Sequence, residues 1–152
     1  MNFTHIPDGT FTIENKETGE FRTFNIDLRT FKPQPGSDKG PEQKWVLSYL
    51  RGPSNSSDFE PFAFVFGHSV EDMVISVWRS KRSADPNERS QYERFALLVG
   101  LVLGSKAGIG APKWGERYDV LEAIPCRRCG EQLTVPDSIR RGIGPVCAKK
   151  AA

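Results

Sequence analysis

The sequence predicts an α+β fold in which an antiparallel β-sheet of about five or six strands carries one main helix. Short segments that alternate apolar and polar residues, separated by turn-forming residues, occupy residues 9–78. One segment with helical periodicity follows, and all three cysteines lie after residue 125. We therefore expect an α+β body over residues 1–124 and a small zinc-knuckle or treble-clef-like module over residues 125–152.

The first two strands are predicted to form a β-hairpin over residues 9–28. Phe11 and Ile13 alternate with polar neighbours, and residues 15–20 are rich in turn formers. The second strand then places three apolar residues on one face, which we assign to the core: Phe24, Ile26 and Leu28.

Further strands are predicted over residues 45–51, 61–66 and 72–78, after a breaker-rich loop at 33–41. Alternation places the aromatic residues of the fourth strand on one face, namely Phe62, Phe64 and Phe66. Such a row could stack on single-stranded nucleic acid. We prefer to assign it to the core, where strand aromatics lie more often.

The main helix is predicted to begin at Asp85-Pro86, because Asp caps free N–H groups and Pro suits the first helical position. Its apolar stripe has the i, i+3, i+4, i+7 spacing of a helix packed against a core: Tyr92, Phe95, Ala96, Val99 and Val102. The helix should end near Gly104. Residues 106–115 are expected to be a loop, and residues 117–124 a last strand.

Composition limits the class of protein. A chain of 152 residues with 38% hydrophobic residues can form one domain with a small appendage. We find neither a signal peptide nor an apolar run long enough to cross a bilayer. These features predict a cytoplasmic protein with no membrane contact, and no small-molecule substrate is evident.

The cysteines carry the clearest chemistry. Cys126 and Cys129 frame a Cys-x-x-Cys-Gly sequence, and Cys147 follows within Gly-Ile-Gly-Pro-Val-Cys. A tight turn lets two thiolates reach one tetrahedral ion, and the glycine relieves the backbone after the second ligand. In a reducing compartment, clustered thiols favour a metal over a disulfide. We predict a zinc site at these cysteines, the alternative being incidental thiols without metal.

A closed structural zinc site needs a fourth ligand, which the sequence leaves open. His68 is the named candidate, and His5 is a second. A nearby carboxylate, water or another chain would also complete the site; the carboxylates considered are Glu122, Glu131 and Asp137.

The Gly142-Ile143-Gly144-Pro145 segment allows two interpretations. It can form the turn before a short helix that carries Cys147, as in a treble-clef-like module whose missing first cysteine would stand at Gly144. Alternatively, it resembles the hairpin of a helix-hairpin-helix motif, in which exposed N–H groups hold a DNA phosphate.

The pattern Cys126-x-x-Cys129-Gly130-x-x-Leu-Thr-x-Pro-x-Ser-Ile-x-x-Gly-Ile-Gly-Pro-x-Cys147 resembles a small zinc-ribbon-like family of phage and bacterial proteins whose function is not established. The family commonly carries Arg after Cys-Gly, where this chain has Glu131. The N-terminal Gly-Thr-Phe-Thr-Ile segment also looks like the opening of small phage proteins with this tail. The resemblance implies a phage or prophage origin and no particular reaction.

Charge is uneven along the chain. Cys126–Ala152 carries six basic and two acidic residues, a net charge of +4. The whole chain has a net charge of +2, so the body has a net charge of −2. We therefore predict that the tail binds nucleic acid, through these residues: Arg127, Arg128, Arg140, Arg141, Gly142, Gly144, Lys149 and Lys150. The alternative is a phage factor that binds a host protein, with zinc purely structural. No catalytic constellation is found, so we expect no enzyme; a nuclease with an open metal site is a weaker third hypothesis.

Overall fold

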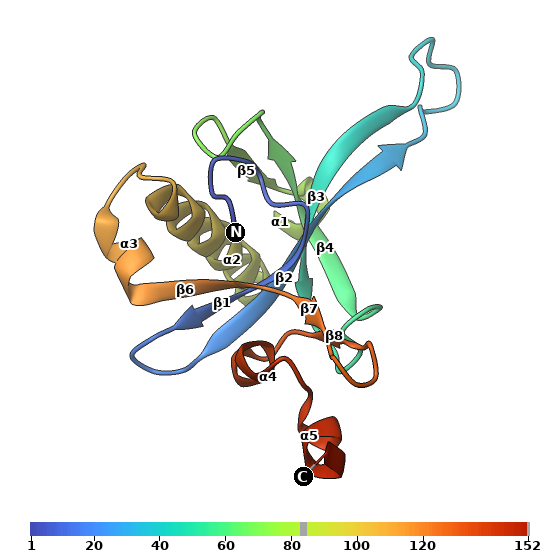
Figure 1. The fold of residues 1–152 in the computed structure, drawn as a ribbon. Helices are drawn as coiled ribbons and strands as arrows, with labels where there is room; N and C mark the ends of the chain where they lie inside the picture. Colours follow the sequence, from blue (N-terminus) through green and yellow to red (C-terminus); the bar gives the residue numbers. More distant parts are fainter. Residues whose placement is uncertain (83–84, 152) are drawn as a thin grey trace.

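The computed structural model describes residues 1–82 and 85–151 and has the α+β architecture that the sequence predicts. Six strands form one antiparallel sheet in the order β5-β4-β3-β2-β1-β6, with a separate two-stranded ribbon in the tail (Figure 1). The sheet strands are β1 Gly9–Asn15, β2 Phe21–Phe31, β3 Glu42–Leu50, β4 Phe59–Phe66, β5 Val74–Val77 and β6 Tyr118–Glu122. The ribbon consists of β7 Ile124–Pro125 and β8 Gln132–Leu133. The helices are α1 Arg79–Arg82, α2 Pro86–Lys106, α3 Pro112–Arg117, α4 Pro136–Arg141 and α5 Pro145–Ala151.

The predicted hairpin is confirmed: β1 and β2 pair antiparallel, with Phe11 opposite Phe24. Gly19 closes the turn at φ 76°, a left-handed conformation that favours glycine. Phe11, Phe24 and Ile26 are almost fully buried on the face that meets α2. Alternation along the strands therefore gives this face of the sheet to the main core.

Helix α2 begins where the sequence predicts. The Asp85 carboxylate accepts hydrogen bonds from the N–H groups of Asn87 and Glu88, which caps the first turn. Its buried side chains are Tyr92, Phe95, Val99, Val102 and Leu103. They pack against the aromatic residues of the sheet, for example with ring centroids of Phe95 and Tyr49 5.0 Å apart.

Three local predictions are wrong. Leu28 is 45% exposed, because β2 and β3 extend beyond α2 as a projecting hairpin (Figure 1). The segment expected to be a loop at 106–115 contains the start of α3, with Pro112 in its first turn.

The third error concerns the row of phenylalanines on β4. A register shift opposite Leu47 and Ser48 inserts Phe62 as an extra residue, which breaks the alternation of faces. Phe62 joins the core and stacks on Tyr92, whereas Phe64 and Phe66 lie on the opposite face. The three rings therefore form no common platform.

The opposite face of the sheet receives the tail. Thr12 is fully buried on this face, and its hydroxyl donates a 2.6 Å hydrogen bond to the backbone carbonyl of Thr134. Asn55, in the β3–β4 loop, exchanges hydrogen bonds with Gln132: its Nδ2 donates to the Gln132 carbonyl at 2.9 Å, and Gln132 Nε2 donates back at 2.7 Å. The tail is thus docked on the body through buried polar contacts. Among the described residues, no helix is both long and apolar enough to span a bilayer.

Glu60 connects the sheet to α1 and α2. Its carboxylate accepts hydrogen bonds from Tyr49 Oη at 2.7 Å, Lys81 Nζ at 3.0 Å and Tyr92 Oη at 3.4 Å, and pairs with Arg51. Burial raises the pKa of this carboxyl group, but the hydrogen bonds from Tyr49 and Lys81 together with the positive charges of Lys81 and Arg51 outweigh burial and hold the pKa below its ordinary value of 4.5.

We predict that Glu60→Gln lowers the free energy of unfolding by about 1–3 kcal/mol at pH 7, the usual loss for hydrogen bonds to a charged group. A depressed pKa contributes stability above the unfolded value, and this is lost as pH falls through the folded value. The gap between variant and parent should therefore shrink below pH 4.5. Denaturant unfolding curves of variant and parent at pH 7 and pH 3 measure this difference in the free energy of unfolding. Glu17→Gln, on an exposed turn, is the matched control and should change stability by less than about 0.5 kcal/mol. An equal loss at both pH values would contradict the assignment.

Candidate metal centre

The first two thiols lie in the turn between β7 and β8. Ile124 pairs with Leu133 and Pro125 with Gln132, so the intervening residues form a tight loop. The Gly130 N–H donates to the Cys126 carbonyl at 2.9 Å, and Gly130 adopts φ 79°. This is the knuckle that the Cys-x-x-Cys-Gly sequence predicts, with the glycine at its left-handed position.

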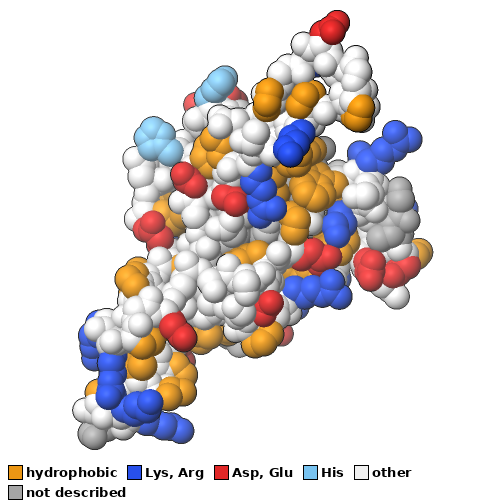
Figure 2. All heavy atoms as spheres, turned by 90° about the vertical axis from the view of Figure 1, so that its right-hand side faces the viewer, with side chains coloured by type: hydrophobic (Ala, Val, Ile, Leu, Met, Phe, Trp, Pro, Cys, Tyr) orange, Lys and Arg blue, Asp and Glu red, His pale blue; other side chains and the backbone are white. Residues whose placement is uncertain are grey.

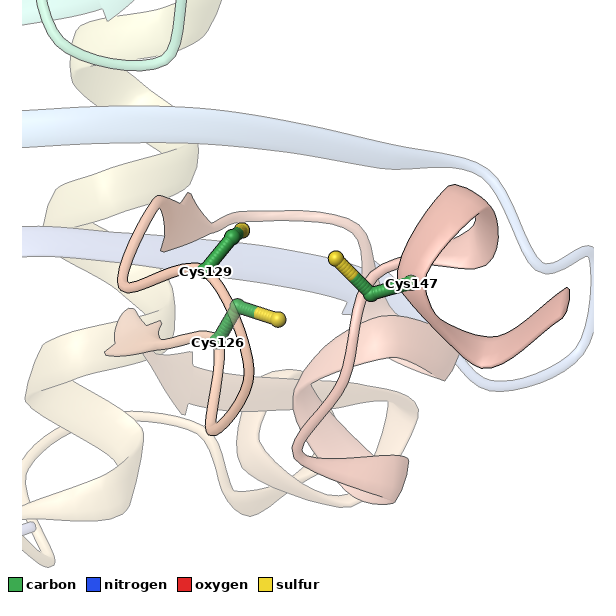
Figure 3. Close-up of side chains that lie close together, drawn as sticks. All are labelled: Cys126, Cys129 and Cys147. Atoms are coloured by element: carbon green, nitrogen blue, oxygen red, sulfur yellow. The ribbon is translucent and has the colours of Figure 1, made fainter. Parts of the chain in front are cut away.

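The third thiol is brought in by the Gly-Ile-Gly-Pro segment. Gly142 ends α4 at φ 73°, and its carbonyl accepts a 3.1 Å hydrogen bond from the backbone N–H of Arg127 in the knuckle. The chain then turns at Gly144 into α5, whose first turn carries Cys147. Figure 3 shows the Cys126 and Cys129 sulfurs pointing from the knuckle toward the Cys147 sulfur.

The three sulfurs form a compact group. All lie within 4.8 Å of one another, with Cys126 buried, Cys147 partly buried and Cys129 exposed. Thiolates that share a tetrahedral zinc ion at about 2.3 Å stand about 3.8 Å apart. The spacing and the donor chemistry therefore fit a metal ion, and residues 124–151 can hold one.

Backbone groups prepare one of the thiols to carry charge. The N–H groups of Cys129, Gly144 and Arg128 point at the Cys126 sulfur and lower the pKa of its thiol to about 6. The opposite holds for Cys147, where a hydrogen bond with the Cys129 thiol and burial raise the pKa to about 11. One negative charge is thus favoured and further ones are opposed, unless a cation lies between the sulfurs.

The structure brings no histidine or carboxylate of the described residues into this group. His68 lies in the turn after β4, where its backbone N–H donates to Asp72 Oδ1 at 3.0 Å. His5 lines a separate pocket together with Glu122. Figure 2 shows both pale-blue histidine side chains far from the basic tip of the tail. Of the candidates for the fourth ligand position, water and a group from another chain are therefore the ones that remain.

All four tail arginines are exposed, and each also bonds to another group of the chain. Arg140 pairs with Glu14 and with Asp119 at 3.3 Å, which ties α4 to the sheet. Arg127 Nη1 donates to the carbonyl of Arg141 at 2.7 Å, and Arg128 Nη1 to that of Cys147 at 3.1 Å. These guanidinium groups brace the module, which the sequence did not reveal because their partners are backbone carbonyls or distant carboxylates.

The two glycines of the hairpin also have internal partners. The Gly142 N–H donates to the carbonyl of Ser138 at 2.8 Å, and the Gly144 N–H points at the Cys126 sulfur. Neither N–H is directed at solvent, where a phosphate would bind. All six cations of the tail are exposed, Arg141 donates to the Asp137 carbonyl at 3.3 Å, and Figure 2 shows basic side chains gathered at the tip of the tail.

Sequence reasoning missed the residues that dock the module. Thr12, Asn55 and Thr134 join it to the sheet, and a second small core forms beneath the thiols around Leu133 and Ile143. No signal in the sequence marks Thr12 as a docking residue, because a threonine between Phe11 and Ile13 fits the alternation of a strand whose polar face is exposed.

The comparisons with known proteins bear on this module alone. Residues 124–152 match the model of a family described as a family of unknown function, DUF6011. No match was found among curated proteins or among solved structures. The predicted likeness of the C-terminal region to a family without established function is therefore confirmed, whereas the phage origin stays a prediction.

The geometry identifies a position where a fourth thiolate would fit. Gly144 lies outside the left-handed region, and a Cβ there would meet Leu133 Cδ2 at 3.5 Å, an ordinary contact. We predict that Gly144→Cys binds zinc more tightly by about tenfold or more, because a tethered thiolate replaces an untethered ligand. Competition with a chromophoric chelator measures the affinity. Gly144→Ser is the control with a similar Cβ but no thiolate. If the two variants bind zinc equally, the fourth ligand stands elsewhere.

Proposed function

We propose that the chain is a non-enzymatic binding protein whose C-terminal module is folded around a structural zinc ion. The observation that supports this is the convergence of three thiols, with backbone N–H groups aimed at the most buried one. A donor set made only of thiolates suits zinc, copper(I) or an iron–sulfur cluster. Zinc is proposed because it needs no redox partner and accepts a tetrahedral site completed by water or a second chain.

The proposed role of zinc is to hold the tail in shape. The core of the module has three buried residues, Cys126, Leu133 and Ile143, which is too small to fold a segment of this length by itself. Metal coordination supplies folding free energy directly to such modules. With the metal bound, the tail can dock on Thr12 and Asn55 as a rigid unit.

Metal analysis tests this proposal. The purified protein should contain one zinc ion per chain, seen as the mass difference between native and denatured spectra, and chelation should lower its melting temperature. Cys129→Ser should lose the metal and the stabilisation. Val146→Ser alters an exposed side chain of the same module and should retain both. Protein that holds no metal, with thiols freely alkylated in the native state, contradicts the proposal.

We propose a protein as the partner, with a phage accessory role in the cytoplasm as the setting that the predicted resemblance suggests. The support is that Arg127, Arg128 and Arg140, although exposed, each already donate to a carbonyl or carboxylate of the chain, which commits part of each guanidinium group to holding the module together. The exposed apolar residues of the tail, Val135 and Val146, also suit a protein surface better than a nucleic acid.

Nucleic acid is the second candidate, favoured by the exposed cations at the end of α5. With Arg141, Lys149 and Lys150 as contacts, binding should be weak, and log K should fall with log salt concentration with a slope of about 2–3. Fluorescence anisotropy with DNA and RNA oligonucleotides measures this. Lys149→Glu with Lys150→Glu should abolish binding, whereas Arg140→Gln should preserve it. A steeper slope, or loss with Arg140→Gln, would contradict this interface, and no binding at low salt eliminates nucleic acid as the partner.

A further inference from the structure

An apolar groove lies along the β5 edge of the sheet. It has a volume of about 550 Å³ and is enclosed by Ile75 and Val77 of β5, Leu97 and Leu101 of α2, and the turn around Ile109. Leu97 is 61% exposed and Ile109 38% exposed, although both line the groove. Apolar surface gathered beside a strand edge indicates a place where another segment docks.

The groove is open because α2 carries small residues along it. Ala96, Gly100 and Gly104 are four residues apart and all line the groove. The backbone does not require glycine at either position: a Cβ at Gly100 would meet only Ile75 Cδ1 at 3.9 Å, and one at Gly104 the Ile109 carbonyl at 3.5 Å. Each glycine in a helix interior costs about 0.5–1 kcal/mol relative to alanine. Two such glycines on one groove indicate that the space itself is used.

The strand beside the groove has a free hydrogen-bonding edge. The Trp78 N–H donates to the Phe62 carbonyl of β4 at 2.8 Å. Because hydrogen-bonding residues alternate along a strand, this bond determines which residues of β5 are bonded to β4. Ser76 and Val74 therefore direct their backbone groups at β4, and Ile75 and Val77 direct theirs away from the sheet. Within residues 1–82 and 85–151, the backbone groups of Ile75 and Val77 have no partner outside the strand ladder. They are available to an added strand.

The charges around β5 are arranged to match a second copy in antiparallel orientation. Glu71 precedes the strand and is exposed, whereas the exposed Arg82 follows it at the end of α1; Lys81, beside Arg82, is already paired with Glu60. A twofold axis through Ser76 places the start of one strand opposite the end of the other. The acidic start would then face the basic end of the partner, on both sides of the axis.

We propose that β5 pairs with β5 of a second copy, so that two sheets join into one. Ile75 of each copy exchanges backbone hydrogen bonds with Val77 of the other, giving four bonds across the junction. The side chains of these residues point to the α2 side and fill the groove of the opposite copy above the small residues of its helix. The pairing is self-complementary in hydrogen bonding, in shape and in charge.

Oligomeric state tests this proposal. Sedimentation equilibrium of the full chain should give twice the 17.0 kDa of one copy. Gly100→Leu places a side chain in the groove, where its Cβ would meet only Ile75 Cδ1 at 3.9 Å, and should weaken association at least about tenfold. Ser90→Leu adds the same side chain to an exposed position of α2 outside the groove and should leave association unchanged.

A cross-link tests the register. Directly opposite residues in a non-hydrogen-bonded pair lie close enough for a disulfide, and Ser76 faces its own copy at the axis. Ser76→Cys should therefore form an intermolecular disulfide when diamide oxidises the two thiols, and peptide mapping should locate the bond at position 76. Ser90→Cys should not form this bond.

Three results would overturn the proposal: a monomer at all concentrations, a dimer insensitive to Gly100→Leu, or a dimer without the cross-link at position 76. A monomer that binds an extended peptide at this edge would assign the groove to another protein instead. Chelation of the metal should leave the dimer intact, since the junction uses no residue of the tail. Failure of the zinc proposal and failure of the dimer are therefore distinguishable.

Discussion

Three thiolates cannot share a space less than 5 Å wide without a cation between them. The tail is built around this constraint. The knuckle directs backbone N–H groups at Cys126, which favours one negative charge, while the high pKa of Cys147 records the cost of adding another. A bound metal ion would remove the conflict and would link the knuckle to α5.

The same constraint decides how the basic residues are used. Arg127 and Arg128 lie within the knuckle, and their guanidinium groups donate to carbonyls of α4 and of α5, so they link the knuckle to both helices. Arg140 reaches carboxylates of the sheet instead. A net charge of +4 in a short segment therefore does not by itself identify a phosphate-binding surface. Part of that charge also holds the module together.

The parts that local rules determine could be predicted from the sequence. The cysteine spacing gives the knuckle, Asp85-Pro86 gives the start of α2, and Gly130 and Gly142 stand where a left-handed backbone is required. The predictions that were wrong concern residues whose positions depend on partners far away in the sequence. The bulge at Phe62 is set by how β4 registers against β3, and the role of Arg140 is set by Glu14, 126 residues away along the chain. Neither relation leaves a periodic pattern in the sequence, so alternation and charge counting mislead at these positions.

The tail and the free edge of β5 lie at opposite edges of the sheet. The tail docks over β1 and β6, through Thr12, Glu14 and Asp119, whereas β5 forms the other edge of the sheet. Two copies joined at β5 would carry their tails at the two far ends of one continuous sheet. A partner with repeated sites could then be held twice, and a weak contact at each tail would become a strong one through effective concentration. In such a dimer the two tails would bind a partner with repeated sites more tightly than one tail does.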